Sequence, residues 1–219
     1  MLSFYLFYRL CYNSTMSNVL LSNIKKNFEK NEVFFIDDIR EKSMTKAAIK
    51  EGLVRLVKEG RIKRFSYGIY YLPGDNEPDL TKAINMRYIE RRGKVCGFYT
   101  GEGFISVLNG KNPSAQEKIE IMTNHATSGK KSVYAFSKRF TLRKPYCPVD
   151  KNNYALNALL SYVAMTPLNK IKENYSVLAN YIKKNHLSAP DVMEMSIYFP
   201  AKTASKLLAS DLYRSLWKH

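Results

Sequence analysis

The sequence is poor in the two residue types that most often hold metals or form disulfides, with three cysteines and three histidines among 219 residues. Cys11, Cys96 and Cys147 lie far apart, form no CxxC pair, and would leave one thiol over if two of them paired. No histidine stands near a cysteine at the spacing of a zinc site. We therefore expect reduced thiols in a cytoplasmic protein, with no metal site and no cofactor.

Long apolar runs are also missing. The run that comes nearest to one, MLSFYLFYRL at residues 1–10, is too short to span a bilayer. It lacks a basic leader region and a small-residue cleavage site, which argues against a signal peptide. We interpret residues 1–16 as an N-terminal extension, with Met16 as an alternative start of translation, and expect no membrane partner.

No catalytic signature is present. Asp37-Asp38 is better explained as a helix start than as a pair of metal ligands, and His125 has no partner at a fixed spacing. VCGFYTGEGFISVLNG at residues 95–110 places a glycine pair before a helix, but lacks the lysine and the spacing of a phosphate-binding loop. We interpret it as a close strand-to-helix turn with Thr100 as the cap. The sequence thus predicts no catalytic residue and no enzyme.

Acidic residues are scarce beside basic ones. The chain has 19 Asp and Glu against 35 Lys and Arg, a formal net charge of +16, and no carboxylate between Ile121 and Val149. Such an excess favours a polyanionic partner, because each neutralised phosphate releases condensed counterions. With 45% hydrophobic residues the chain can form packed cores, and its length suits one large or two small domains.

The most informative stretch is residues 43–74, SMTKAAIKEGLVRLVKEGRIKRFSYGIYYLPG. Its first part predicts a helix that Ser43 or Thr45 can cap and that ends before Gly60. Lys50 and Lys58 lie on the expected outer face, and Lys46 lies in the first turn, nearer the edge of the apolar stripe. The inner face carries apolar residues at helical spacing, namely Ile49, Leu53, Leu56 and Val57.

After Gly60 the sequence pattern changes to that of strands. Residues 61–66 and 69–72 predict a hairpin with Tyr67-Gly68 at its tip, and three cations lie at its start: Arg61, Lys63 and Arg64. A helix, a tight glycine end and a basic hairpin form the second half of a winged helix-turn-helix. That module places a helix in a DNA major groove and a hairpin beside it.

The preceding residues complete the module. Val19 to Phe28 predicts a helix, Val33 to Ile36 a strand, and Asp37 to Glu41 a short helix capped by Asp37 or Asp38. Residues 17–74 would then form a winged helix-turn-helix domain, with a short turn at Lys42 to Met44. A lysine-bearing helix face is also what any solvated helix shows, so that alternative stays open.

A second, larger domain is predicted at residues 79–219, after the turn-rich segment GDNEP at residues 74–78. It should begin with a helix from Asp79 to Arg92. Strands are expected at residues 118–123, 132–136 and 140–142, and helices at residues 154–165, 171–184, 192–198 and 201–216. The expected fold class is α+β: an N-terminal winged helix-turn-helix followed by an α+β domain with a helical C-terminal part.

The expected strands of this second domain are basic. Their cations could form a surface that contacts DNA flanks, RNA or an acidic protein, or could merely keep exposed strands soluble. The residues of this possible second basic surface are Lys130, Lys131, Lys138, Arg139, Arg143 and Lys144.

The segment from Met44 to Pro73, with EG, RIKR and GIYYLP after its helix, resembles the winged helix of AbiEi-type antitoxins of bacterial abortive-infection toxin–antitoxin systems. GFYTGEGFISVLNG and EIMTN resemble that family's second domain, and the resemblance covers residues 17–215. It implies a cytoplasmic phage-defence antitoxin. Such a protein represses its own promoter by binding inverted repeats in double-stranded DNA, and it neutralises a nucleotidyltransferase-type toxin.

The resemblance also implies residue roles and a state of assembly. A monomer or weak dimer would place two copies on the DNA, and direct contact with the toxin is left open. Two alternatives remain: a winged-helix regulator without a toxin, whose second domain senses a ligand or dimerises, and a nucleic-acid-processing enzyme. The expected DNA-binding residues are Ser43, Thr45, Lys46, Lys50, Arg61, Lys63, Arg64 and Tyr67.

Overall fold

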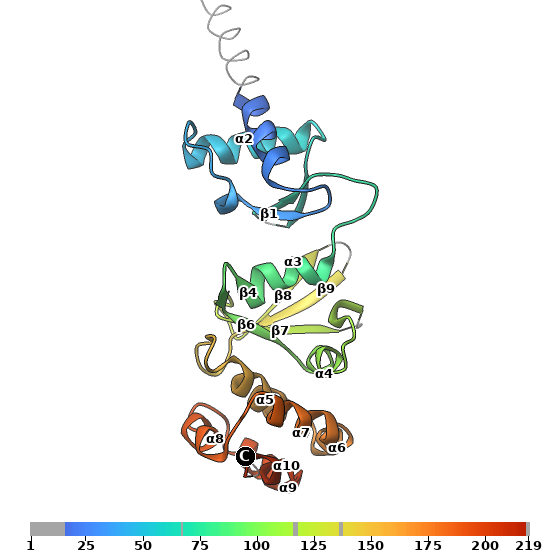
Figure 1. Ribbon diagram of the computed structural model, residues 1–219, viewed down its shortest axis with the longest axis vertical. Helices are drawn as coiled ribbons and strands as arrows, with labels where there is room; N and C mark the ends of the chain where they lie inside the picture. Colours follow the sequence, from blue (N-terminus) through green and yellow to red (C-terminus); the bar gives the residue numbers. More distant parts are fainter. Residues whose placement is uncertain (1–15, 67, 116–117, 136–137, 218–219) are drawn as a thin grey trace, which may run out of the picture. The chain divides into compact units, whose positions relative to one another are not determined.

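The computed structural model describes residues 16–66, 68–115, 118–135 and 138–217 (Figure 1). The fold is α+β and divides into two compact units, the first ending at Asp79 and the second beginning at Leu80. Predictions for residues 1–15 and for Tyr67 fall outside the described residues. Within those residues, no helix is long and apolar enough to cross a membrane.

From residue 16 onward, the described part of the first unit contains two helices and a small sheet. A helix at residues 16–27 leads to β1 (Val33–Phe35), the 3₁₀ turn η1 (Ile36–Asp38) and α2 (Lys46–Lys58). The hairpin of β2 (Lys63–Ser66) and β3 (Ile69–Tyr71) follows. The three strands are antiparallel in the order β1-β3-β2.

The core of this unit lies between the two helices and the sheet. The predicted inner face of α2 is confirmed, since Ile49, Leu53 and Leu56 are buried and Val57 packs against the same cluster. Leu20 belongs to this cluster, and a Cβ added to Gly52 would lie 2.6 Å from its Cδ2 atom. The missing side chain at position 52 therefore lets α2 approach the first helix closely.

The helix expected from Asp37 to Glu41 is wrong. Only the three-residue turn η1 forms there, and Asp38 accepts a hydrogen bond from the Phe35 backbone N–H at 3.0 Å. Glu41 is held outside any helix, because its carboxylate accepts hydrogen bonds from Ser43 and Asn23. The acidic residues therefore form local turns instead of a helical N-terminus.

A four-stranded sheet forms the middle of the second unit. Its order is β6-β7-β9-β8, built from β6 (Gly97–Thr100), β7 (Ile119–Thr123), β8 (Lys130–Ala135) and β9 (Lys138–Arg143). Only β7 and β9 are parallel. α3 (Leu80–Ile84) covers one face, and α4 (Glu102–Leu108) and the C-terminal helices lie on the other (Figure 1).

The helix expected from Asp79 to Arg92 is also wrong in its second half. α3 passes into the π-helical turn η2 (Asn85–Ile89), and the chain then enters a small hairpin of β4 (Glu90–Arg91) and β5 (Lys94–Val95). Arg92 and Gly93 both have positive φ, 52° and 74°, as a two-residue hairpin turn requires. Their turn geometry therefore ends the helix that the apolar pattern suggested.

Thr100 does not cap α4, contrary to expectation. It is buried in β6, and Gly101, with φ of 60°, occupies the N-cap position. The close strand-to-helix turn itself is confirmed, since β6 ends at Thr100 and α4 begins at Glu102. Glycine suits this position because a side chain is strained at positive φ.

The C-terminal part is helical, as predicted. α5 (Tyr154–Met165) has the predicted bounds, and two of the other predicted helices are broken. Asn174 separates α6 (Leu168–Glu173) from α7 (Tyr175–Lys184), and a left-handed Asp211 separates α9 (Lys202–Ala209) from α10 (Leu212–Leu216). The helix expected at residues 192–198 is α8 (Ala189–Ser196).

Helix α5 is buried along most of its length. All residues from Ala155 to Ala164 are buried, and Leu159 and Val163 have no exposed surface. Its carboxyl end meets α9, where the Lys206 ammonium donates to the carbonyl oxygens of Val163, Ala164 and Thr166 at 3.1, 3.1 and 2.6 Å. This ammonium satisfies the free carbonyl groups and opposes the negative end of the helix dipole.

We expect Lys206→Met to lower the free energy of unfolding by about 1.5–3 kcal/mol, because three charge-assisted hydrogen bonds are lost at a partly buried helix end. Chemical denaturation monitored by circular dichroism measures this. Lys202→Met is the matched control, since Lys202 lies on the same helix and is exposed. Equal losses in both variants would contradict the capping role.

Candidate nucleic-acid interface

The outer face of α2 carries solvated cations. Lys46 and Lys50 lie one helical turn apart and are both exposed. The Lys46 ammonium lies 3.6 Å from Asp37 Oδ1, with 89% and 51% of the two side chains exposed. Such a solvated pair contributes little energy, so Lys46 is only weakly held by it. Both lysines are therefore accessible to an anionic partner.

The amino end of α2 is fixed by local hydrogen bonds. Thr45 Oγ1 accepts from the Ala48 backbone N–H at 3.2 Å, which confirms Thr45 as the cap. Ser43 donates through both its backbone N–H and its hydroxyl to Glu41, at 3.2 and 2.7 Å. These bonds lower the pKa of Glu41. Ser43 and Thr45, both expected at the DNA, thus also stabilise the start of the helix.

The hairpin presents further cations on a sheet edge. Lys63 and Arg64 are exposed on β2, the edge strand of the three-stranded sheet. Being consecutive in a strand, they project toward opposite faces. A register shift between Arg64 and Ser66 distorts the strand, and Arg64 Nε donates to the Ser66 carbonyl oxygen at 3.3 Å. The cationic edge therefore leads directly into the hairpin tip.

Arg61 lies in a different basic environment. It lines an open groove of about 820 Å³ together with Lys25, Lys26 and Lys30, near the end of the first helix. These three lysines were not among the predicted site residues. The signal was present as the basic run NIKKNFEKN at residues 23–31, which puts three lysines within six residues. The structure groups Arg61 with these lysines in one groove.

An exposed valine completes the outer face of α2. Val54 follows Lys50 by one turn and is 48% exposed, and Ala47 precedes Lys50 by one turn. Val54 was not among the residues predicted to contact DNA, and an isolated exposed apolar residue needs no functional explanation. Beside two accessible lysines, however, it adds an apolar contact point to the same helix face.

The cations of the possible second basic surface fall into two groups, those that are bound to other groups of the second unit and those that are exposed. Lys138 Nζ donates to the Ser114 carbonyl oxygen at 2.9 Å, and Arg143 pairs with the largely buried Glu120 at 3.1 Å. These two cations therefore have structural roles. The remaining members are exposed, namely Lys130, Lys131, Arg139 and Lys144.

An exposed aromatic pair lies on the same hairpin. Tyr134 is 68% exposed, and the Arg139 guanidinium lies 5.9 Å from its ring centroid across the β8–β9 ladder. Arg139 also donates to Ser132 Oγ at 3.0 Å. Cross-strand register places Lys130 on this face and Lys131 on the opposite one. The six predicted residues thus do not form one continuous surface.

Groups that could support catalysis or metal binding are dispersed in the described part of the chain. No three histidine, cysteine or carboxylate side chains there come close enough to hold a metal ion. Burial raises the pKa of both Cys96 and Cys147, which disfavours reactive thiolates. Burial, with Arg87 and Arg91 nearby, lowers the pKa of His125.

Comparison with known proteins does not assign the chain to a family. No family model matches it, and no curated protein matches it. The resemblance to AbiEi-type antitoxins therefore stays a prediction from the residues themselves.

We expect Thr45→Ala to lower the free energy of unfolding by about 1 kcal/mol, because the Ala48 N–H loses its cap. Thr45→Ser keeps the hydroxyl and should retain most of the stability. Thermal melts of both variants measure the difference. A loss of the same size in Thr45→Ser would attribute the effect to the threonine methyl group and not to the cap.

Proposed function

We propose that the first unit is a winged helix-turn-helix that binds double-stranded DNA through α2 and the β2–β3 hairpin. The observation that supports this most strongly is the two-sided character of α2. One face is buried against the first helix and the sheet, while Lys46 in the first turn and Lys50 one turn later are exposed to solvent. A basic hairpin follows directly, in the chain order of that module.

Each part of this surface suits a different contact. Lys50, with Ala47 and Val54 one turn away on either side, has the chemistry to contact a base edge and thymine methyl groups in the major groove. Lys63 and Arg64 on the hairpin suit phosphates, which position the protein without carrying sequence information. Tyr67 remains an expected phosphate contact at the hairpin tip.

The carboxylates near the start of α2 restrict how DNA can approach. Asp37 lies 3.6 Å from Lys46, and Glu41 is hydrogen-bonded to Ser43 just before the helix. These negative charges would repel phosphates at the N-terminal end of the helix. We therefore place the main DNA contact along the face around Lys50, with Lys46 released from Asp37 when phosphate binds.

We further propose that the chain acts as an autorepressing antitoxin. The support is the sequence resemblance together with the DNA-binding chemistry of the first unit. Two copies would bind an inverted repeat in the chain's own promoter, and the second unit would counteract a nucleotidyltransferase-type toxin. A regulator without a toxin is the second candidate, and a large cavity in the second unit favours it.

We expect Lys46→Ala with Lys50→Ala to weaken binding to promoter DNA, and Lys63→Ala with Arg64→Ala to reduce the salt slope of binding. Each lost phosphate contact should lower the slope of log K against log salt by about 0.9. Gel shifts over a salt series measure both effects. Lys151→Ala with Lys172→Ala, both exposed in the second unit, controls for the loss of two charges. Unchanged affinity in both test pairs would exclude this interface.

We expect co-expression of the chain with a nucleotidyltransferase-like toxin encoded by an adjacent gene to restore growth. Lys46→Ala with Lys50→Ala should restore growth equally when both genes are driven by foreign promoters, because neutralisation is assigned to the second unit. Growth assays on induced cultures measure this. Failure of rescue with every such neighbour would reject the antitoxin role and leave DNA binding intact.

A further inference from the structure

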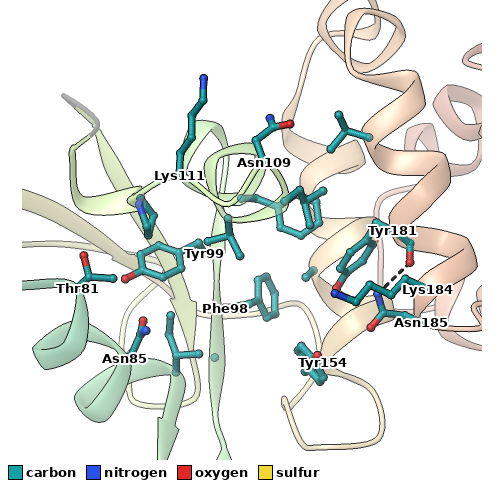
Figure 2. A pocket seen from close by; sticks show the side chains of 18 of the residues that line it. Thr81, Asn85, Phe98, Tyr99, Asn109, Lys111, Tyr154, Tyr181, Lys184 and Asn185 are labelled. Carbon is teal, nitrogen blue, oxygen red and sulfur yellow. Dashed lines mark hydrogen bonds between the residues drawn. The ribbon is translucent and has the colours of Figure 1, made fainter.

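The second unit contains a cavity that neither DNA binding nor toxin control explains. It has a volume of about 680 Å³ and lies beside β6, the edge strand of the sheet. α3 and η2 border one side of β6, and α4, α5 and α7 border the other (Figure 2). A volume of this size lies in the range of small-molecule sites.

The floor of the cavity is aromatic and rigid. Phe98 and Phe104 are buried, and the Phe104 ring meets the Tyr181 ring edge-on, with centroids 5.2 Å apart and planes at 86°. The Tyr181 hydroxyl donates to the Ala155 carbonyl oxygen at 3.1 Å, which fixes that ring on buried α5. Burial raises the pKa of Tyr181, so the ring stays neutral at physiological pH. Such fixed faces suit a flat ring.

The rim of the cavity is polar and positively charged. Lys184 extends from α7 toward Tyr181, while Lys111 extends outward beyond α4 (Figure 2). Among the described lining residues there is no carboxylate, so the two ammonium groups have no opposing charge in the lining itself. This charge balance favours an anion and disfavours a cation.

Carboxamides occupy the remaining polar positions of the rim. Asn85, Asn109, Asn180 and Asn185 all line the cavity. Asn109 and Asn185 each donate to a helix carbonyl oxygen, at 3.0 and 2.9 Å, which orients the side chain and leaves its carbonyl oxygen as an acceptor. A carboxamide can both donate and accept, as can the edges of nucleobases.

We propose that this cavity binds a nucleotide, with the base against the aromatic floor, its edge on the rim asparagines, and its phosphate on Lys184. The floor and rim together accommodate three features of a nucleotide: a flat aromatic ring, hydrogen-bond donors and acceptors at its edge, and an anionic group. This proposal does not rest on DNA binding or toxin control. It would give the second unit a ligand-sensing site.

Titration calorimetry of the full chain without DNA tests the proposal, with AMP, GMP, CMP and UMP as probes. We expect at least one nucleotide to bind, and Lys184→Gln to weaken it roughly tenfold through loss of the phosphate contact. Lys183→Gln, an exposed neighbour outside the cavity lining, should change nothing. The nucleoside of each nucleotide that binds should bind more weakly than the nucleotide itself.

A second variant fills the cavity from its exposed rim. Val107 lies on α4 and is 46% exposed, so Val107→Trp should fold normally and abolish binding by occupying the space. Thermal melts of each variant confirm that the fold is kept.

Four results would overturn the proposal. No heat from any nucleotide at about 5 mM would exclude even a millimolar site. Equal binding of a nucleotide and its own nucleoside would remove the role of the phosphate. Binding unchanged in Lys184→Gln and in folded Val107→Trp would place the ligand elsewhere. Binding of indole-3-carboxylate without any nucleotide would assign the cavity to smaller aromatic acids.

Discussion

The burial of α5 is the constraint on which the second unit depends. α5 has ten consecutive buried residues, and the last carbonyl groups of a helix have no partner within the helix itself. Lys206 on α9 supplies them with one ammonium group. Burial and the nearby Lys202 lower the pKa of Lys206, whereas the three carbonyl oxygens favour its charged form. The position of α9 is thereby tied to that of α5.

The same burial explains the polar groups inside α5 and the rigidity of the cavity beside it. Asn157 has no exposed surface, and its amide donates to the Cys147 carbonyl oxygen at 3.2 Å, so it is satisfied within the core. The Ala155 carbonyl oxygen accepts from Tyr181 and so holds one wall of the cavity.

Sequence periodicity predicted the elements whose burial follows one regular face. α2 and its inner residues were predicted because 3.6-residue spacing places Ile49, Leu53 and Leu56 together, and α5 has the predicted bounds. The prediction of a helix as far as Arg92 was wrong. The apolar spacing typical of a helix continues along this segment, but Arg92 and Gly93 have positive φ and form the turn of a hairpin. Arginine gives no local signal for that conformation. The cavity could not be predicted, since its lining comes from segments as distant as Thr81 and Asn185.

Net charge is a poor guide to which cations face a partner, and the second unit shows why. The strand register and the contacts within the unit determine whether each cation is bound to another protein group or exposed. Neither can be inferred from the number of charged residues. Lys138, Arg143 and Lys206 are bound to a carbonyl oxygen, a carboxylate and three carbonyl oxygens respectively. Their charges stabilise the fold, so moving them to a phosphate would leave buried acceptors unsatisfied.

The cations of α2 and the hairpin differ in this respect. Lys50 and Lys63 are exposed, and Lys46 pairs with the half-exposed carboxylate of Asp37. Binding an anion therefore costs these residues little, because water already competes for them. The first unit is favoured as the nucleic-acid interface by the small free energy needed to release its cations from their present contacts. The net charge of +16 does not by itself distinguish the two units.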